Sequence, residues 1–197
     1  MAALTGAPRL LEHAVGYALA TVAQATPQLL PLATPCEGWD LRTLLLHVGD
    51  SLGVLAEALR AGQVGPGPLP GHEPTTETDP VACLRRQARY LLGACAAASA
   101  EERLVAIADR ELTASMVTAA GAIEIAVHGW DISVACGVRQ PVPPGLAAAL
   151  LLAAPLLIPR ETRTGLFADP VAVPEPACPS DRLVAFLGRQ PRPGGIA

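Results

Sequence analysis

Residues 123–135 read IEIAVHGWDISVA, an apolar stretch in which a carboxylate and an imidazole stand four positions apart. Side chains four apart lie on one face of an α-helix, so a helix here presents Glu124 and His128 to the same point. A charged group in such apolar surroundings is costly unless a partner compensates it. The stretch therefore predicts a buried helix whose polar groups have a chemical partner elsewhere in the chain.

The residue that we expect to be this partner is His47, in a second apolar segment, LRTLLLHV (residues 41–48). Two imidazoles and one carboxylate suit zinc, nickel, iron(II) or manganese, and three protein ligands leave coordination positions open, as in catalytic sites. His47, Glu124 and His128 are therefore the predicted ligands of a metal site in a helical bundle. The simpler alternative is a hydrogen-bonded Glu124–His128 pair and a histidine satisfied within the core.

Other side chains are candidates for supporting roles around the predicted ligands. Metal-bound histidines usually donate their second ring N–H to an acceptor, and Asp50 and Asp131 each follow a predicted histidine ligand by three residues. The remaining histidines, His13 and His72, are expected to face solvent. Two tryptophans are candidates for the pocket wall or for core packing, Trp39 and Trp130. Three arginines are candidates for holding a substrate carboxylate, Arg42, Arg139 and Arg163.

The composition of the 197-residue chain excludes several classes of function. Its net charge of −4 gives no electrostatic reason to expect nucleic acid or an anionic membrane as a partner. All 14 basic residues are arginine, which excludes Schiff-base chemistry and the phosphate loop that needs a lysine. We expect a cytoplasmic protein, because no basic N-terminal region precedes an apolar core and a cleavage site.

The five cysteines form no C-x-x-C pair, and their odd number is typical of a reducing compartment. A structural role is the expectation for each of them. Catalysis by a cysteine nucleophile is the weaker alternative, because no cysteine stands beside a histidine in the sequence.

Hydrophobic residues make up 51% of the chain and aromatic residues only 3%, so the core is expected to be Leu, Ala and Val, which favour helices. Helical spacing and caps such as Asp40 and Asp79 predict an all-α fold, an antiparallel four-helix bundle with an extra C-terminal helix. No strand pattern of any length appears, and residues 101–113 fit a loop, an extended segment or a helix. The expected helices span residues 10–24, 40–59, 79–98, 115–136, 143–157 and 180–188.

The linkers suggest a division at about residue 160. Residues 1–160 are expected to form the bundle, with a Gly/Pro-rich loop over residues 62–78, and residues 161–197 a short extension packed on it. The tripeptide Gly-Trp-Asp occurs twice. At residues 38–40 it is expected to start a helix, whereas at residues 129–131 it lies inside one, where a turn signal is not expected.

Three stretches of the chain resemble a known bacterial family. TPCEGWDLR, followed by HV (residues 34–48), is similar to the start of its second helix, and EIAVHGWDI (residues 124–132) is similar to its second motif. GLF (165–167), VAVP (171–174) and DRLVAFLGR (181–189) resemble the end of one actinobacterial branch. The family is that of the mycothiol-dependent maleylpyruvate isomerases, part of the DinB-like four-helix-bundle superfamily.

The resemblance implies a metal, typically zinc, at the positions of His47, Glu124 and His128. It also implies mycothiol, the thiol of high-GC bacteria, as a cosubstrate, and the lysine-free composition fits such a host. The founding isomerase carries a further C-terminal α/β domain with a catalytic arginine, and the branch that this chain resembles lacks the full domain. The resemblance therefore says more about the metal than about the substrate. Because DinB-like bundles often pair, we expect a monomer or a homodimer.

The expected function is that of an enzyme in which a divalent metal activates a thiolate, that of mycothiol, for transfer to a small electrophilic metabolite or for its isomerisation. One alternative keeps the metal without the thiol and hydrolyses, isomerises or cyclises a small metabolite. The other is a non-catalytic metal-binding bundle, which predicts no accessible cavity at the three ligands. The expected partner is a small molecule, with neither nucleic acid nor a membrane involved.

Overall fold

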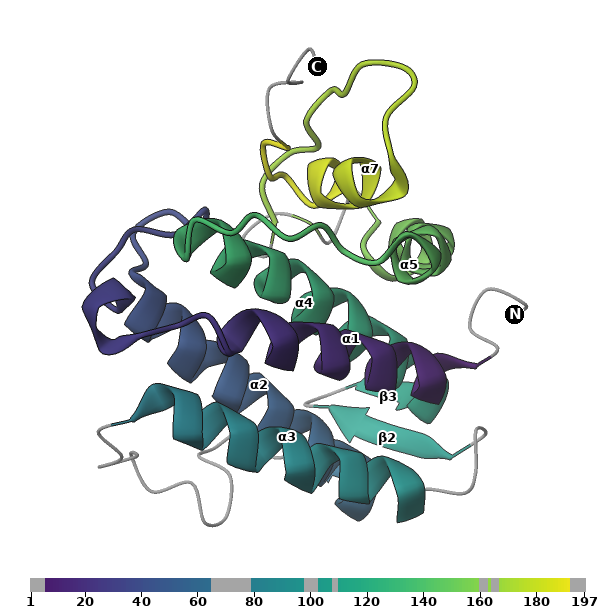
Figure 1. Cartoon of the computed structure of the whole chain (residues 1–197). Coiled ribbons are helices and arrows are strands. Elements are labelled where there is room, and N and C mark those ends of the chain that lie inside the picture. The colour runs from purple at the N-terminus through teal and green to yellow at the C-terminus, as the bar shows by residue number, and fades with distance from the viewer. Residues whose placement is uncertain are drawn as a thin grey trace.

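The computed structural model describes residues 6–64, 79–97, 103–107, 110–159, 163 and 167–191. Its main body consists of α1 (Ala7–Val22), α2 (Leu41–Ala61), α3 (Pro80–Ala97) and α4 (Ala114–Ala135). Helix α1 packs on α4, and α2 packs on both α3 and α4 (Figure 1). The predicted all-α bundle is confirmed, and each of these helices begins and ends within three residues of the expected bounds.

Helix α2 starts where the sequence predicts, at an aspartate cap. The backbone N–H of Thr43 donates to Oδ1 of Asp40 at 2.8 Å, while Asp40 itself is extended. This bond satisfies one of the N–H groups that the first turn of a helix leaves without a partner. Gly62 ends the helix in the left-handed region, with φ 72°. The cap matters for the site, because it fixes the register of the turn that carries His47.

Replacing Asp40 by alanine is expected to lower the free energy of unfolding by about 1 kcal/mol. Hydrogen bonds from the side chain and backbone of Thr43 hold the pKa of Asp40 below its ordinary value of 3.8. A folded pKa below the unfolded one stabilises the protein above the unfolded pKa, and this stabilisation is lost as the pH falls through the folded pKa. The difference between wild type and Asp40→Ala should therefore vanish in acid, as measured by urea unfolding below and above pH 4. The Asp40→Asn variant, which keeps a cap without a charge, should show no such pH dependence.

Helix α4 is buried nearly all round and lies against three other helices. Gly129 explains how α1 comes so close to it. A Cβ at this position would lie 3.0 Å from Cε1 of Tyr17 and 3.2 Å from the backbone Cα of Ala18. The second Gly-Trp-Asp is therefore not a turn signal, because its glycine leaves room for the neighbouring helix.

A small sheet contradicts the expectation that the chain has no strands. It contains β1 (Gln63–Val64), β2 (Leu104–Ile107) and β3 (Arg110–Thr113) in that order. Strand β1 is parallel to β2, with Gln63 opposite Ala106, and β2 is antiparallel to β3. Strands of two to four residues are too short to show an alternating pattern, so the sequence offers only an extended segment over residues 101–113 as one alternative and gives no sign of β1. The predicted loop lies outside the described residues from position 65 to position 78.

The chain continues into α5 (Pro144–Leu157) and α7 (Pro179–Phe186), which pack on each other on the side of the bundle formed by α1 and α4 (Figure 1). A one-turn 3-10 helix, η2 (Pro27–Leu29), precedes α2. Among the described residues, no helix is both long enough and apolar enough to cross a membrane. The division of the chain near residue 160 stays a prediction.

Candidate metal centre

The three predicted ligands come together between α2 and α4. The ligand atoms of His47, Glu124 and His128 all lie within 4.8 Å of one another. His47 comes from the second turn of α2, and the other two come from successive turns of α4. The four-residue spacing on one buried helix thus places the carboxylate and the imidazole on a common face, opposite the other histidine. Their role as metal ligands stays a prediction.

The Glu124 carboxylate is held by two groups from α2. Its Oε1 lies 3.3 Å from Nε2 of His47 and accepts a hydrogen bond of 2.5 Å from the hydroxyl of Ser51. Burial acts to raise the pKa of Glu124, but the hydrogen bonds from His47 and Ser51 together with the His128 charge outweigh it and lower the pKa. The group is therefore a carboxylate near neutral pH, which is the form that binds a cation.

His128 is oriented by Asp131, one turn further along α4. Its Nδ1 lies 3.0 Å from Oδ2 of Asp131, whose side chain is 0% exposed. Burial acts to raise the pKa of Asp131, but His128 and Arg189 outweigh it, so the pKa is lowered. An ionised Asp131 accepts a hydrogen bond from Nδ1–H, which leaves Nε2 of His128 as the nitrogen that can bind a metal. This contact is the one that the sequence predicts for Asp131.

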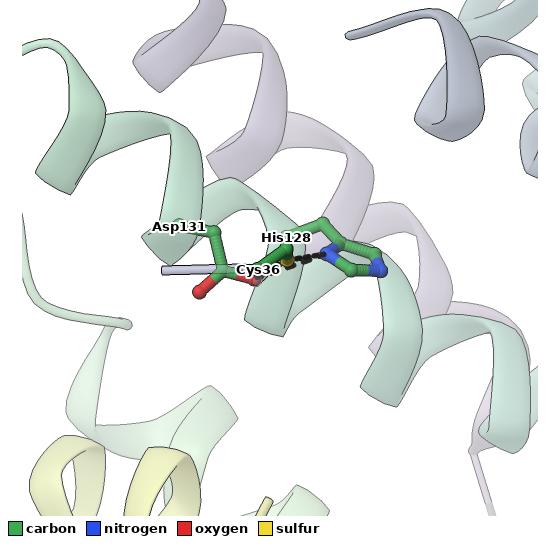
Figure 2. Close-up of side chains that lie close together, drawn as sticks. All are labelled: Cys36, His128 and Asp131. Carbon is green, nitrogen blue, oxygen red and sulfur yellow. Dashed lines mark hydrogen bonds and ion pairs between the residues drawn. The ribbon is translucent and has the colours of Figure 1, made fainter. Parts of the chain in front are cut away.

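Two further residues reach Asp131 that sequence reasoning missed, Cys36 and Arg189. The Cys36 thiol donates to Oδ2 of Asp131 at 3.3 Å, with its Sγ 3.8 Å from Nδ1 of His128 (Figure 2). Burial first, and then the Asp131 charge, raise the pKa of Cys36 to about 12. The Arg189 guanidinium donates to both carboxylate oxygens of Asp131, at 3.3 and 2.8 Å. Both residues lie far from α4 in sequence, so no local pattern points to them.

Two groups of side chains could hold a metal ion, and the position of Arg189 decides between them. Besides the predicted ligands, Cys36, His128 and Asp131 also lie within 4.8 Å of one another. A guanidinium nitrogen of Arg189 stands 2.8 Å from Asp131 and 3.5 Å from the Cys36 sulfur, so a fixed positive charge already lies beside this second group. A further cation there would meet direct repulsion. In the first group, Glu124 interacts with His47, Ser51 and His128, none of which carries a permanent positive charge.

The donor set of the first group fits a divalent metal. Ligands about 2.0–2.1 Å from a tetrahedral zinc ion lie roughly 3.3–3.4 Å apart. The separation of 3.3 Å between Nε2 of His47 and Oε1 of Glu124 matches this spacing. Both side chains are also a little over a third exposed, at 37% and 36%, so an ion and a small molecule have access to them.

The ligands open onto a cavity of about 970 Å³. Trp39 flanks it, with its ring centroid 4.7 Å from that of His47 in an edge-on arrangement. Apolar residues from the end of α5 and from the C-terminal segment also line the cavity, as do Cys36 and Arg189. The apolar residues are Leu157, Ile158, Phe167, Ala168 and Gly188. The cavity is large enough for a substrate of drug-like size.

The other predicted pocket residues lie elsewhere. Trp130 and Arg139 line a neighbouring cavity of about 750 Å³, while Arg163 is buried and donates to the backbone oxygens of Ala168 and Phe186. Arg42 and Asp50 are exposed on α2, and Arg42 is not among the described residues that line the ligand cavity. Five residues separate Arg42 from His47, which is about 140° around a helix. His13 is exposed as expected, and His72 lies outside the described residues.

Comparison with known families gives one match. Residues 11–133 match the family described as "Mycothiol maleylpyruvate isomerase N-terminal domain". The match covers more than half of the 197 residues and includes the three predicted ligands. No curated protein and no solved structure matches the chain. The family match, with the bundle and the ligand geometry, shows that the chain belongs to the mycothiol maleylpyruvate isomerase N-terminal domain family.

Proposed function

We propose that this protein is a metal-dependent enzyme that adds a thiol, mycothiol by the name of its family, to a small electrophilic metabolite, either for transfer or for thiol-assisted isomerisation. The observation that carries the proposal is the position of His47, Glu124 and His128 on the wall of a cavity of about 970 Å³. A non-catalytic bundle would have no need of such a cavity at the ligands, so the geometry favours an enzyme.

When bound, a divalent metal supplies a positive charge that lowers the pKa of a thiol or water beside it. The chain's own residues arrange the site for that chemistry. Ser51 holds the Glu124 carboxylate, and Asp131 holds the His128 ring, so other residues of the chain orient both donor groups. The metal remains unassigned, because two imidazoles and a carboxylate suit zinc, nickel, iron(II) and manganese alike.

The cavity wall orients the substrate and limits water. Leu157, Ile158 and Phe167 give the cavity an apolar surface, and Trp39 and the predicted ligands line the same cavity. An electrophile whose apolar part rests on that surface is held in the same cavity as the ligands. Holding nucleophile and electrophile together in this way reduces the entropy cost of the reaction.

The nucleophile is expected to come from outside the chain. Cys36 lines the cavity, but its pKa is raised to about 12 and its S–H donates to Asp131, so it is a neutral thiol near neutral pH. The thiolate is the reactive form of cysteine. This argues against the cysteine-nucleophile alternative and for a free low-molecular-weight thiol as cosubstrate.

The proposal is tested on a set of small electrophilic metabolites by following both their conversion and the consumption of thiol, because an isomerisation regenerates the thiol and only a transfer consumes it. The metal-loaded chain is assayed with mycothiol, with a different low-molecular-weight thiol and with none. We expect conversion that requires mycothiol and metal and that falls to background in Glu124→Gln, while the exposed cysteine variant Cys178→Ser keeps full activity. Turnover of candidate metabolites without any thiol would instead favour the thiol-independent alternative. Absence of turnover in every arm would contradict an enzyme of this type.

A further inference from the structure

Arg189 stands at the start of a chain of side chains that ends at a predicted metal ligand. Its Nε and Nη2 donate to the two oxygens of Asp131 at 3.3 and 2.8 Å. Oδ2 of Asp131 in turn lies 3.0 Å from Nδ1 of His128. The Asp131 side chain is fully buried and that of Arg189 is 11% exposed, so water screens this ion pair little. The C-terminal segment is thus connected to His128 through one carboxylate.

The position of Arg189 is fixed by the end of α7. Its backbone N–H donates to the carbonyl of Val184 at 2.9 Å, and its Nη1 donates to the carbonyl of Leu187 at 2.9 Å. Gly188, with φ +82°, makes the turn between them, and a Cβ there would lie 2.8 Å from the backbone oxygen of Ala168. Because both the backbone and the guanidinium of Arg189 are bonded to residues of this segment, Arg189 moves with α7 when α7 is displaced.

The hydrogen bonds of Arg189 indicate that it positions other groups rather than binding substrate. A guanidinium has five N–H donors. The contacts to the two Asp131 oxygens, to the Cys36 sulfur and to the Leu187 carbonyl use four of them. Its charge is matched by the buried Asp131 carboxylate, so little capacity is left for a substrate anion.

We propose that Arg189 is a positioning residue through which the docking of the α7 segment and the binding of a metal at His47, Glu124 and His128 strengthen each other. The inference rests on the proposed function, because it requires a metal at these residues. With Arg189 in place, Asp131 is held where it fixes the tautomer and the ring orientation of His128. Coupling between two equilibria is reciprocal, so a metal that needs an oriented His128 also stabilises the docked segment.

The test uses zinc alone as the probe and the full chain as the protein. Zinc affinity is measured by competition with a chromogenic chelator for wild type, Arg189→Ala, Arg189→Lys and Arg182→Ala, the last being an exposed arginine of α7. We expect Arg189→Ala to bind zinc about 10-fold more weakly or worse, as for residues that support a ligand. Arg189→Lys should be intermediate, because lysine keeps the charge without the planar fork. Arg182→Ala should match wild type.

The reciprocal effect is read from amide hydrogen exchange in α7. Zinc should slow this exchange in wild type, and the slowing should disappear in Arg189→Ala. A merely structural arginine would speed exchange equally with and without zinc. Should Arg189→Ala fail to give the far-UV circular dichroism of wild type, Arg189→Lys, which retains a cation, carries the same comparison.

Three results would overturn the inference. Equal zinc affinity of wild type and the Arg189 variants refutes it while leaving the proposed function intact. Zinc binding that leaves α7 exchange unchanged in wild type refutes the coupling in the same way. A wild-type chain that binds no zinc, nickel, iron(II) or manganese overturns both this inference and the proposed function.

Discussion

Replacement of His128 by alanine is expected to remove the bound metal, from about one ion per wild-type chain to almost none. The substitution deletes one of three ligands, so the loss of affinity should exceed the roughly 10–100-fold that is typical of residues supporting a ligand. Elemental analysis of untagged protein, wild type beside His128→Ala and Glu124→Ala, measures it. The helices should persist in the variants, since α4 is held by apolar contacts on several sides.

His13→Ala is the matched control, because His13 is an exposed histidine of α1. Its metal content should equal that of wild type. Metal retained in His128→Ala would place the ion elsewhere. A wild-type chain that stays metal-free after metal is added back would refute the metal centre and favour a binding bundle.

Substitution of Gly129, the residue after His128, is expected to lower the free energy of unfolding and to leave the metal affinity unchanged. In Gly129→Val, even the first added carbon would lie 3.0 Å from the Tyr17 ring and 3.2 Å from the backbone Cα of Ala18. The two helices must then separate, and we expect the free energy of unfolding to fall by about 3 kcal/mol. Urea denaturation followed by far-UV circular dichroism measures the change.

Gly93→Val makes the same substitution in α3, where a Cβ at Gly93 would meet nothing within 4 Å. Glycine and valine differ modestly in helix propensity, so its stability should stay within about 0.5 kcal/mol of wild type. Equal effects of the two substitutions would show that close packing of α1 on α4 is not what Gly129 provides.

The helices and the common face of Glu124 and His128 were predictable because their signals are local. Asp40 and Asp79 cap the helices that they precede, each accepting backbone N–H groups of the first turn. Glu124, His128 and Asp131 share one helix, so the helical period alone fixes their relative placement. No spacing rule connects His47 to α4; it is predicted as an imidazole within a second apolar helix, and the family resemblance points to the same residue. Ser51, one turn after His47, was within reach of the same periodicity argument but was not singled out.

The remaining features depend on contacts between distant segments. Cys36 and Arg189 contact Asp131, although they are 95 and 58 positions away from it in the sequence. Strand β1 pairs with β2 only after α3 has returned the chain, and its two residues carry no pattern of their own. A cysteine or an arginine of this kind is recognisable only when tertiary packing has placed it. The arginines that were considered from sequence were judged by type alone, which does not separate a buried anchor such as Arg163 from one that reaches the site.

The helices that carry Glu124 and His128 are held together by an extensive apolar core, which stabilises a chain of this size without an ion. Small zinc domains differ, because their chains fold only when the ion arrives. An ion taken up here would join a chain that has already folded. Its identity would then be set by which divalent metal the cell offers at that moment, within the affinity order of the first-row metals. Protein purified from cultures grown with different metal supplements would accordingly carry different ions on one unchanged scaffold.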